Sequence, residues 1–120
     1  MRVWAAAFAA ALCGAALPAA AQGWEPKRNA ELQLLDKVTA RVTVLKAGVG
    51  TATPFGSLSI QVRACNARPE GEVPDAAAWM EITDNLRPGV AAFRGWMFAN
   101  APGVSMLEHP VYDVRVLDCK

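Results

Sequence analysis

The residues best suited to chemistry in this 120-residue chain surround His109, which is its only histidine. Glu108 and Asp113 stand close by, but a metal site built on these three side chains would need a fourth ligand that the sequence does not supply. Pro110 favours an extended conformation for the residue before it, so we expect His109 to form a hydrogen bond to a backbone carbonyl or to a carboxylate. A metal-ligand or general-base role is the weaker interpretation, and the sequence predicts no metal and no cofactor.

Other forms of catalysis lack their characteristic residues. None of the three serines lies in a G-x-S-x-G turn, and the chain contains no phosphate-binding loop, dinucleotide fingerprint or EF-hand loop. Two pairs of carboxylates fall in polar loops or at strand edges, where solvation explains them: Glu70 with Glu72, and Glu81 with Asp84. We therefore expect that the protein is not an enzyme.

Aromatic side chains are the remaining candidates for binding. Trp79, Trp96 and Tyr112 have the ring types that stack on sugars or anchor a protein partner. Packing in the interior is the alternative, and it is the better one for Trp96 and Phe98 because their segment is apolar on both faces. Trp24 lies in a polar, proline-containing segment, where an exposed ring would either dock on the domain or contact a partner.

The N-terminus has the organisation of a secretory signal peptide: an arginine, an alanine-rich apolar stretch, Pro18 and three alanines ending at Ala21. We expect cleavage after Ala21 and a periplasmic location. The expected parts are a signal peptide (1–21), an exposed N-terminal tether (22–30) and a single β-domain (31–120). An uncleaved membrane anchor is the alternative, but the apolar stretch falls short of the ~20 residues that span a bilayer, so we expect no membrane insertion after cleavage.

Loss of the signal peptide would change both the charge and the cysteine count. The full chain has 12 Lys and Arg against 11 Asp and Glu, so removal of Arg2 leaves 11 of each (12 − 1 = 11). Nucleic acid and anionic membranes require a basic surface, so neither is an expected partner. Removal of Cys13 leaves Cys65 and Cys119, which we expect to form a disulfide in an oxidising compartment. Closing that loop would stabilise the fold by about 3 to 4 kcal/mol.

Alternation of apolar and polar residues predicts a series of short strands. The expected strands cover residues 38–45, 57–65, 76–84, 90–100 and 111–119. Three further stretches stay open: 29–36 fits a helical turn or a strand, 76–78 also permits a short helix, and 104–108 fits a helical turn. Regular spacing with Gly and Pro turns indicates an all-β fold, a small β-sandwich or barrel of about five to seven strands with one disulfide and at most one short helix.

The same alternation predicts which side chains face the core. On the second expected strand these are Leu58, Ile60, Val62 and Ala64, and on the last they are Tyr112, Val114 and Val116. On the third strand, Met80 and Ile82 lie opposite Trp79, Glu81 and Thr83. The segment 90–100 is apolar on both faces, so we expect it in the middle of the structure.

Three stretches of the sequence resemble one known family: LDKVTARV, FGSLSIQVRAC and GWMFANAPGVSMLEHPVYDVRVLDC. They look like the domain of unknown function 2155 family, small exported proteins that are mostly alphaproteobacterial, and the likeness covers residues 35–119. The resemblance matches Cys65 and Cys119 to the family's two cysteines. It also matches residues 95–98 and 108–113 to the family's C-terminal signature, and it implies no particular activity or ligand.

These observations predict a non-catalytic exported β-domain that binds or stabilises a protein of the cell envelope. The residues expected to form its binding surface or signature are Trp79, Trp96, Phe98, Glu108, His109, Tyr112 and Asp113. The alternative is a module that binds a small ligand or a glycan through Trp79, Trp96 and Tyr112. Rings aligned along an open groove would favour a sugar, whereas a flat apolar patch would favour a protein.

Overall fold

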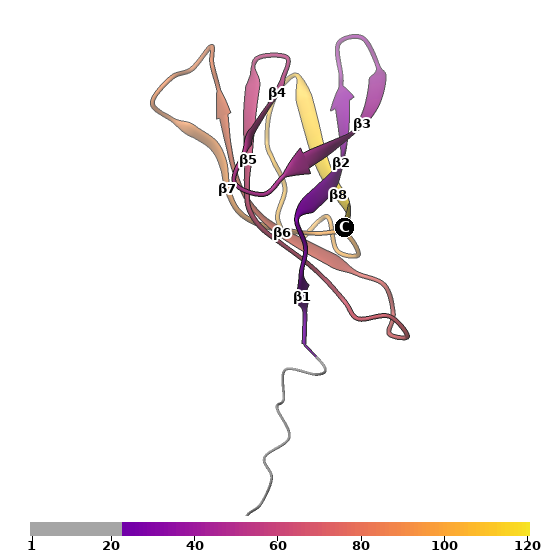
Figure 1. Ribbon diagram of the computed structural model, residues 1–120. Helices are drawn as coiled ribbons and strands as arrows, with labels where there is room; N and C mark the ends of the chain where they lie inside the picture. Colours follow the sequence, from indigo (N-terminus) through magenta and orange to yellow (C-terminus); the bar gives the residue numbers. More distant parts are fainter. Residues whose placement is uncertain (1–22) are drawn as a thin grey trace, which may run out of the picture.

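The fold is built from β-strands. A computed structural model describes residues 23–120, and this part of the chain contains eight strands and no helix (Figure 1). The strands are β1 (Glu25–Pro26), β2 (Asn29–Asp36), β3 (Arg41–Gly48), β4 (Ala52–Phe55), β5 (Leu58–Ala67), β6 (Ala76–Asp84), β7 (Ala91–Phe98) and β8 (Tyr112–Cys119). The all-β prediction is confirmed, and the short strands β1 and β4 take the number above the expected five to seven. The predicted signal peptide lies outside the described residues.

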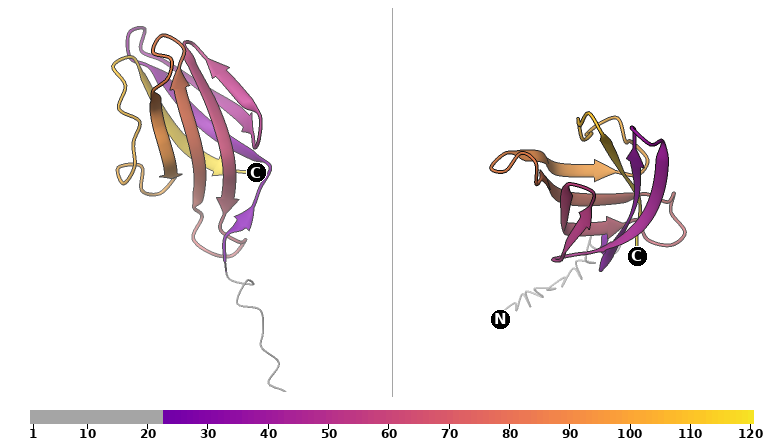
Figure 2. Two further views of the ribbon diagram at one scale, coloured as in Figure 1. Left: turned by 90° about the vertical axis from the view of Figure 1, so that its left-hand side faces the viewer. Right: turned by 90° about the horizontal axis from the view of Figure 1, so that it is seen from above.

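The strands form two antiparallel sheets that enclose the core between them (Figure 2). The larger sheet has the order β1-β5-β6-β7, with β4 also paired to β5, and the smaller sheet has the order β3-β2-β8. The last strand, β8, contacts both β5 and β6 across the interior. This arrangement is a small sandwich, which is one of the two architectures that the strand pattern predicts.

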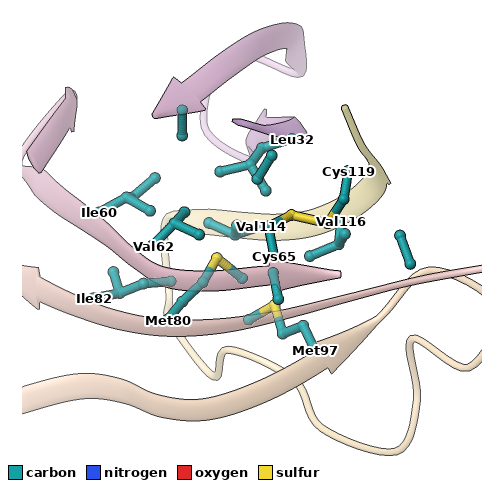
Figure 3. Close-up of a cluster of buried hydrophobic side chains, with 14 of the residues drawn as sticks. Leu32, Ile60, Val62, Cys65, Met80, Ile82, Met97, Val114, Val116 and Cys119 are labelled. Carbon is teal, nitrogen blue, oxygen red and sulfur yellow. A yellow bond between two sulfur atoms is a disulfide. The ribbon is translucent and has the colours of Figure 1, made fainter. Parts of the chain in front are cut away.

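The core consists of aliphatic side chains from the inner faces of both sheets. Its largest fully buried members are Leu32, Leu34, Leu58, Ile60, Met80, Ile82, Val62 and Val116. Cys65 of β5 and Cys119 of β8 form a disulfide within this core (Figure 3). The predicted disulfide is therefore confirmed, and it joins the larger sheet to the smaller one.

Each cysteine lies just beyond a β-bulge. In β5 the pairing with β6 shifts between Val62 and Ala64, and in β8 the pairing with β2 shifts at Leu117. A bulge adds one residue to a strand, so the face on which later side chains lie is exchanged. After the first bulge, Cys65 is buried, whereas Ala64 is half-buried and pairs with a residue of the outer face. The expectation that Ala64 faces the core is therefore wrong.

The first hairpin differs from expectation because its turn falls inside the predicted strand 38–45. The Asp36 carboxylate accepts hydrogen bonds from the backbone amides of Val38 (2.9 Å) and Thr39 (3.2 Å). Ala40 follows with a φ of 57°, a conformation that is uncommon for residues other than glycine. An Asp that bonds to the amides following it favours a turn over a strand. Strand β3 therefore begins after this turn, and the preceding residues form β2 rather than a helical turn.

Strand β7 is an edge strand of the larger sheet, so the expectation that residues 90–100 lie in the middle is wrong. Its inner face contributes Met97, which is buried, while Trp96 on the outer face is 40% exposed. Strand β7 is apolar on both faces because its outer face carries aromatic side chains that pair with residues of β6. Cross-strand pairs of this kind stabilise a sheet even when the strand lies at its edge. The expectation that Trp96 packs in the interior is therefore wrong as well.

The remaining differences concern the connections. The segment expected to be an exposed tether includes β1, whose two residues are exposed and pair with Asn66 and Ala67 of the larger sheet. The connection from β7 to β8 contains turns, and residues 104–108 do not form the helical turn that was one option. Across residues 23–120 we find no helix that is long and apolar enough to cross a membrane.

Candidate functional site

His109 lies in a polar cluster with Asp84, Ser57 and Tyr112, which we call the histidine cluster. Asp84 ends β6, Ser57 precedes β5, and Tyr112 begins β8. The Nε2 atom of His109 lies 2.8 Å from Oδ2 of Asp84, and their side chains are only 10% and 7% exposed. The hydrogen bond to a carboxylate that we expected for His109 is thus present.

Both ring nitrogens of His109 are engaged. Nδ1 accepts hydrogen bonds from the backbone amides of Val111 (3.0 Å) and Tyr112 (3.2 Å). An accepting ring nitrogen carries no proton, so Nε2 carries the proton and donates it to Asp84. Lys37 donates a further bond to the backbone carbonyl of His109 at 2.7 Å. Proton transfer to or from a substrate would therefore have to break one of the bonds that hold the ring.

Asp84 is held in its charged form. The hydrogen bond with His109 is the largest cause that lowers the pKa of the Asp84 carboxyl below its ordinary value of 3.8. The backbone amide of Leu86, 2.9 Å from Oδ1, and the hydroxyl of Ser57 lower this pKa further, while burial acts in the opposite direction. Donors that favour the ionised form outweigh the cost of desolvation, so Asp84 is a carboxylate at neutral pH.

The order of the three polar side chains differs from that of a catalytic triad. In a triad the histidine lies between the serine and the aspartate and takes the proton of the serine. Here the carboxylate of Asp84 bonds to His109, and the hydroxyl of Ser57 acts on that carboxylate, whose pKa it lowers, rather than on the histidine. A carboxylate with a lowered pKa is a weak base, so Ser57 is not activated by this arrangement. The geometry indicates a structural cluster.

The other two residues of the proposed metal site lie apart from this bond. Asp113 forms an ion pair with Lys37 at 3.1 Å, and Glu108 is exposed. In the described part of the chain, His, Cys, Asp and Glu side chains do not form any group of three or more that could hold a metal ion. Glu108, His109 and Asp113 are thus close in sequence without sharing a site.

Tyr112 packs within the histidine cluster. Its ring centroid lies 5.3 Å from that of His109 and 5.5 Å from that of Phe55. The ring also covers Gly56 so closely that a Cβ atom at Gly56 would lie 2.7 Å from Cζ of Tyr112. Gly56 has a φ of 55°, so glycine is favoured there by conformation as well as by space. Tyr112 belongs to the smaller sheet, apart from the two tryptophans with which it was grouped.

Those tryptophans meet on the outer face of the larger sheet. Trp79 of β6 and Trp96 of β7 are direct cross-strand partners. The next pairs on the same face are Ala77 with Phe98 on one side and Glu81 with Arg94 on the other, since side chains two residues apart share a face. We call this surface the aromatic face, and it comprises Trp24, Asn66, Ala77, Trp79, Glu81, Arg94, Trp96 and Phe98.

An open groove of about 300 Å³ lies at one end of the aromatic face. It is lined by Trp24, Asn66, Ala77, Trp96 and Phe98. Ala77 lies between Asn66 and Phe98 in the sheet register, so its small side chain leaves a hollow between larger neighbours. Phe98 therefore lines a surface groove, which corrects its expected place in the interior. Trp24 and Trp96 are each 40% exposed, so rings remain available to a ligand.

Arginine side chains border the aromatic rings. The guanidinium of Arg68 lies 5.0 Å from the ring centroid of Trp24, and that of Arg94 lies 5.8 Å from the ring of Trp79. Arg94 and Arg63 both form ion pairs with Glu81, at 3.6 and 3.4 Å. Tryptophan and arginine are the residue types most enriched where protein partners bind tightly.

Two parts of these sites were missing from the sequence-based predictions. Asp84 was noted only as a solvated carboxylate, because its partner His109 lies 25 residues away in sequence. Asn66 and Ala77 line the groove but have unremarkable residue types, so only the strand register reveals their place beside Phe98. Trp24 carried a usable signal, since a tryptophan in a polar segment indicated docking or partner contact.

Comparison with known proteins places these features in a family. A model of the family described as "Uncharacterized protein conserved in bacteria (DUF2155)" matches residues 30–119. An uncharacterized protein of Rickettsia prowazekii (strain Madrid E) is 27% identical over 93 residues, which cover 76% of this chain and 60% of that relative. No solved structure matches. The chain therefore belongs to the DUF2155 family of uncharacterized bacterial proteins.

Proposed function

We propose that this protein is an exported, non-catalytic β-domain of the periplasm that binds a protein of the cell envelope through its aromatic face. The observation that carries the proposal is the exposure of Trp24 and Trp96, each 40%, around an open groove. Burying a large ring releases substantial hydrophobic free energy, and rings left accessible beside arginines are typical of partner-binding surfaces. In the histidine cluster, His109 and Asp84 bond to each other and to backbone amides, which supports the absence of catalysis.

Export is supported by two features of the chain. The N-terminal sequence has the parts of a signal peptide, and the Cys65–Cys119 disulfide belongs to a class of bond that persists in oxidising compartments. We expect protein isolated from its host to begin at Gln22 and to contain no free thiol. Intact mass measured with and without a thiol-alkylating reagent tests both points, and retention of residues 1–21 would contradict the proposal.

A glycan ligand is the second candidate, because the rings border an open groove rather than a flat patch. Sugar sites combine stacking with several hydrogen bonds to hydroxyl groups. The groove lining has one polar side chain, Asn66, alongside Trp24, Trp96, Phe98 and Ala77. Because the groove offers few hydrogen-bonding groups, it favours a protein partner over a sugar.

Site-specific photocrosslinking in the periplasm of the host tests the proposal. A photoreactive amino acid with an aromatic side chain, which keeps a ring at position 96, should give one discrete crosslinked protein, whereas the same group at the exposed Val44 of β3 should not. The crosslink at position 96 should disappear when Trp24 is replaced by alanine, because Trp24 lines the same groove. Equal crosslinking at both positions, or a product that ignores Trp24→Ala, would contradict binding through the aromatic face.

A further inference from the structure

We infer that the partner presents an extended segment in which an acidic residue and an aromatic or large aliphatic residue are two positions apart. The inference rests on the proposed function, because it specifies what the aromatic face binds. The acidic side chain would bind Arg94, and the apolar side chain would enter the groove beside Trp96.

The charge of the aromatic face is complementary to a carboxylate. Glu81 is shared by two guanidinium groups, since Arg63 approaches Oε2 at 3.4 Å and Arg94 approaches Oε1 at 3.6 Å. One carboxylate against two guanidinium groups leaves a positive charge uncompensated. The Arg94 side chain is 68% exposed, and its ion pair uses Nε. Its two terminal amino groups therefore remain for a second carboxylate, which a guanidinium binds in a planar, bidentate manner.

The groove, in contrast, suits an uncharged side chain. The residues that line it are Trp24, Asn66, Ala77, Trp96 and Phe98, none of which is charged. The nearby Arg68 is neutralised by Glu72 at 3.1 Å. A volume of about 300 Å³ is at the lower end of the range for ligand sites, which indicates that one side chain enters rather than a long ligand.

Arg94 and Trp96, the wall of the groove nearest to Arg94, have the spacing of alternate residues in an extended chain. Arg94 and Trp96 are two residues apart on β7 and lie on the same face, which separates them by about 7 Å along the strand. Side chains two positions apart in an extended partner segment share a face and have the same separation. Such a segment can therefore place its carboxylate at Arg94 and its apolar group against Trp96, where that group enters the groove, at the same time.

Selection of displayed peptides on the mature protein tests this inference. Random nine-residue segments should be enriched, on the wild-type protein, for an acidic residue two positions from an aromatic or leucine residue. Binding of fluorescein-labelled selected peptides, followed by anisotropy, should weaken by about tenfold or more in Arg94→Gln, the cost of one charge-assisted hydrogen bond. Trp96→Ala should abolish binding, while Arg41→Gln, which removes an exposed arginine from β3, should leave the affinity unchanged.

The outcomes separate this inference from the proposed function. Peptides that depend on Trp96 but bind equally to wild type and Arg94→Gln would overturn the acidic requirement and leave the aromatic face as the binding surface. Absence of enrichment, or peptides indifferent to both changes, would overturn both. The same variants are titrated with trigalacturonate, an acidic sugar, and cellotriose, a neutral one. Saturable binding of trigalacturonate that requires Arg94, without any enriched peptide, would overturn the peptide segment in favour of an acidic glycan.

Discussion

The histidine cluster and the aromatic face differ in whether their side chains bond within the protein or remain accessible to a partner. In the histidine cluster, both ring nitrogens of His109 and both oxygens of Asp84 bond to other groups of the protein. On the aromatic face, Trp24 and Trp96 are each 40% exposed around a groove. The Arg94 side chain is 68% exposed, and within residues 23–120 its terminal amino groups form no ion pair with a carboxylate. The first region uses its polar groups internally, and the second presents its groups to solvent.

This difference shows that residue type is a poor guide to chemistry when availability is not considered. Histidine, aspartate and serine are the usual components of hydrolytic sites, yet in the described residues no buried side-chain nitrogen or oxygen lacks a hydrogen-bond partner. Tryptophan and phenylalanine are usual core residues, yet Trp96 and Phe98 lie on the outer face of an edge strand. We expect changes in the histidine cluster to reduce stability without affecting binding, and changes on the aromatic face to do the reverse.

The largest effect on stability should come from the bond that joins the two sheets. Replacing Cys65 and Cys119 together by alanine should lower the free energy of unfolding by about 3 to 4 kcal/mol, because the unfolded chain regains the freedom of a long loop. Urea unfolding, followed by tryptophan fluorescence for the aromatic face and by circular dichroism for the strands, measures the loss. Two separate transitions in the variant would show that the two regions belong to independently stable units, contrary to our expectation.

The next largest effect should come from Gly56, which lies under the ring of Tyr112. Gly56→Ala should cost about 2 to 4 kcal/mol, since it combines a steric clash with a φ that alanine adopts reluctantly. Gly50→Ala is the matched control: its φ is 85°, but no atom lies within 4 Å of the added group, so only the conformational cost of about 1 kcal/mol should remain. Thermal unfolding measures both, and equal losses would contradict the close packing on Tyr112.

His109→Gln tests whether the histidine cluster is structural. The variant keeps size and polarity, so we expect it to lose about 1 to 2 kcal/mol, the scale of one buried hydrogen bond. Glu108→Gln changes an exposed neighbour and should have almost no effect. The crosslink at position 96 should persist in both variants. Stoichiometric metal in the purified wild-type protein that disappears in His109→Gln would contradict the structural role.

Acid should weaken the same cluster in a defined range. The folded-state pKa of Asp84 is lowered below 3.8, so its carboxylate stabilises the fold above that pH and the contribution is lost as the pH falls through the folded-state value. Wild-type protein should therefore lose more stability between pH 5 and about pH 2 than Asp84→Asn does. Urea unfolding at several pH values gives the two curves, and parallel curves would argue against an ionised Asp84 in the folded protein.

The smallest effect on stability should come from the aromatic face, where the effect on binding should be greatest. Trp96→Ala removes an exposed ring and one cross-strand contact with Trp79, which is worth at most about 1 kcal/mol. Chemical denaturation provides the measurement, with peptide binding assayed on the same preparation. A loss of several kcal/mol would mean that Trp96 is part of the core, and the comparison between the two regions would then fail.

The sequence was sufficient for the features that depend on local alternation and on composition. The all-β class, the span of β6 and the opposition of Met80 and Ile82 to Trp79 all follow from period-two patterns. The disulfide followed from the cysteine count. The position of β7 at the edge of its sheet could not be predicted. A sequence that is apolar on both faces fits a central strand, but it fits an edge strand with an aromatic outer face equally well. The Asp84–His109 bond depends on register between distant segments, which local patterns do not encode.

The two bulges have a consequence for how this sequence can change in length. If the same residues followed an unbroken alternation, Cys65 of β5 and Cys119 of β8 would lie on the outer face, so the bulges bring both cysteines inward. Deleting Arg63 or Leu117 would convert the bulge to regular alternation and leave both cysteines on the inner face, whereas inserting one residue between a bulge and its cysteine would turn that cysteine outward and separate the two sulfur atoms. Substitutions along these strands are tolerable wherever volume and polarity are kept, whereas one inserted residue changes the face on which the cysteine lies. Relatives that retain the disulfide should accordingly place single-residue insertions in the loops and not in these segments, while absence of either bulge residue is compatible with the disulfide.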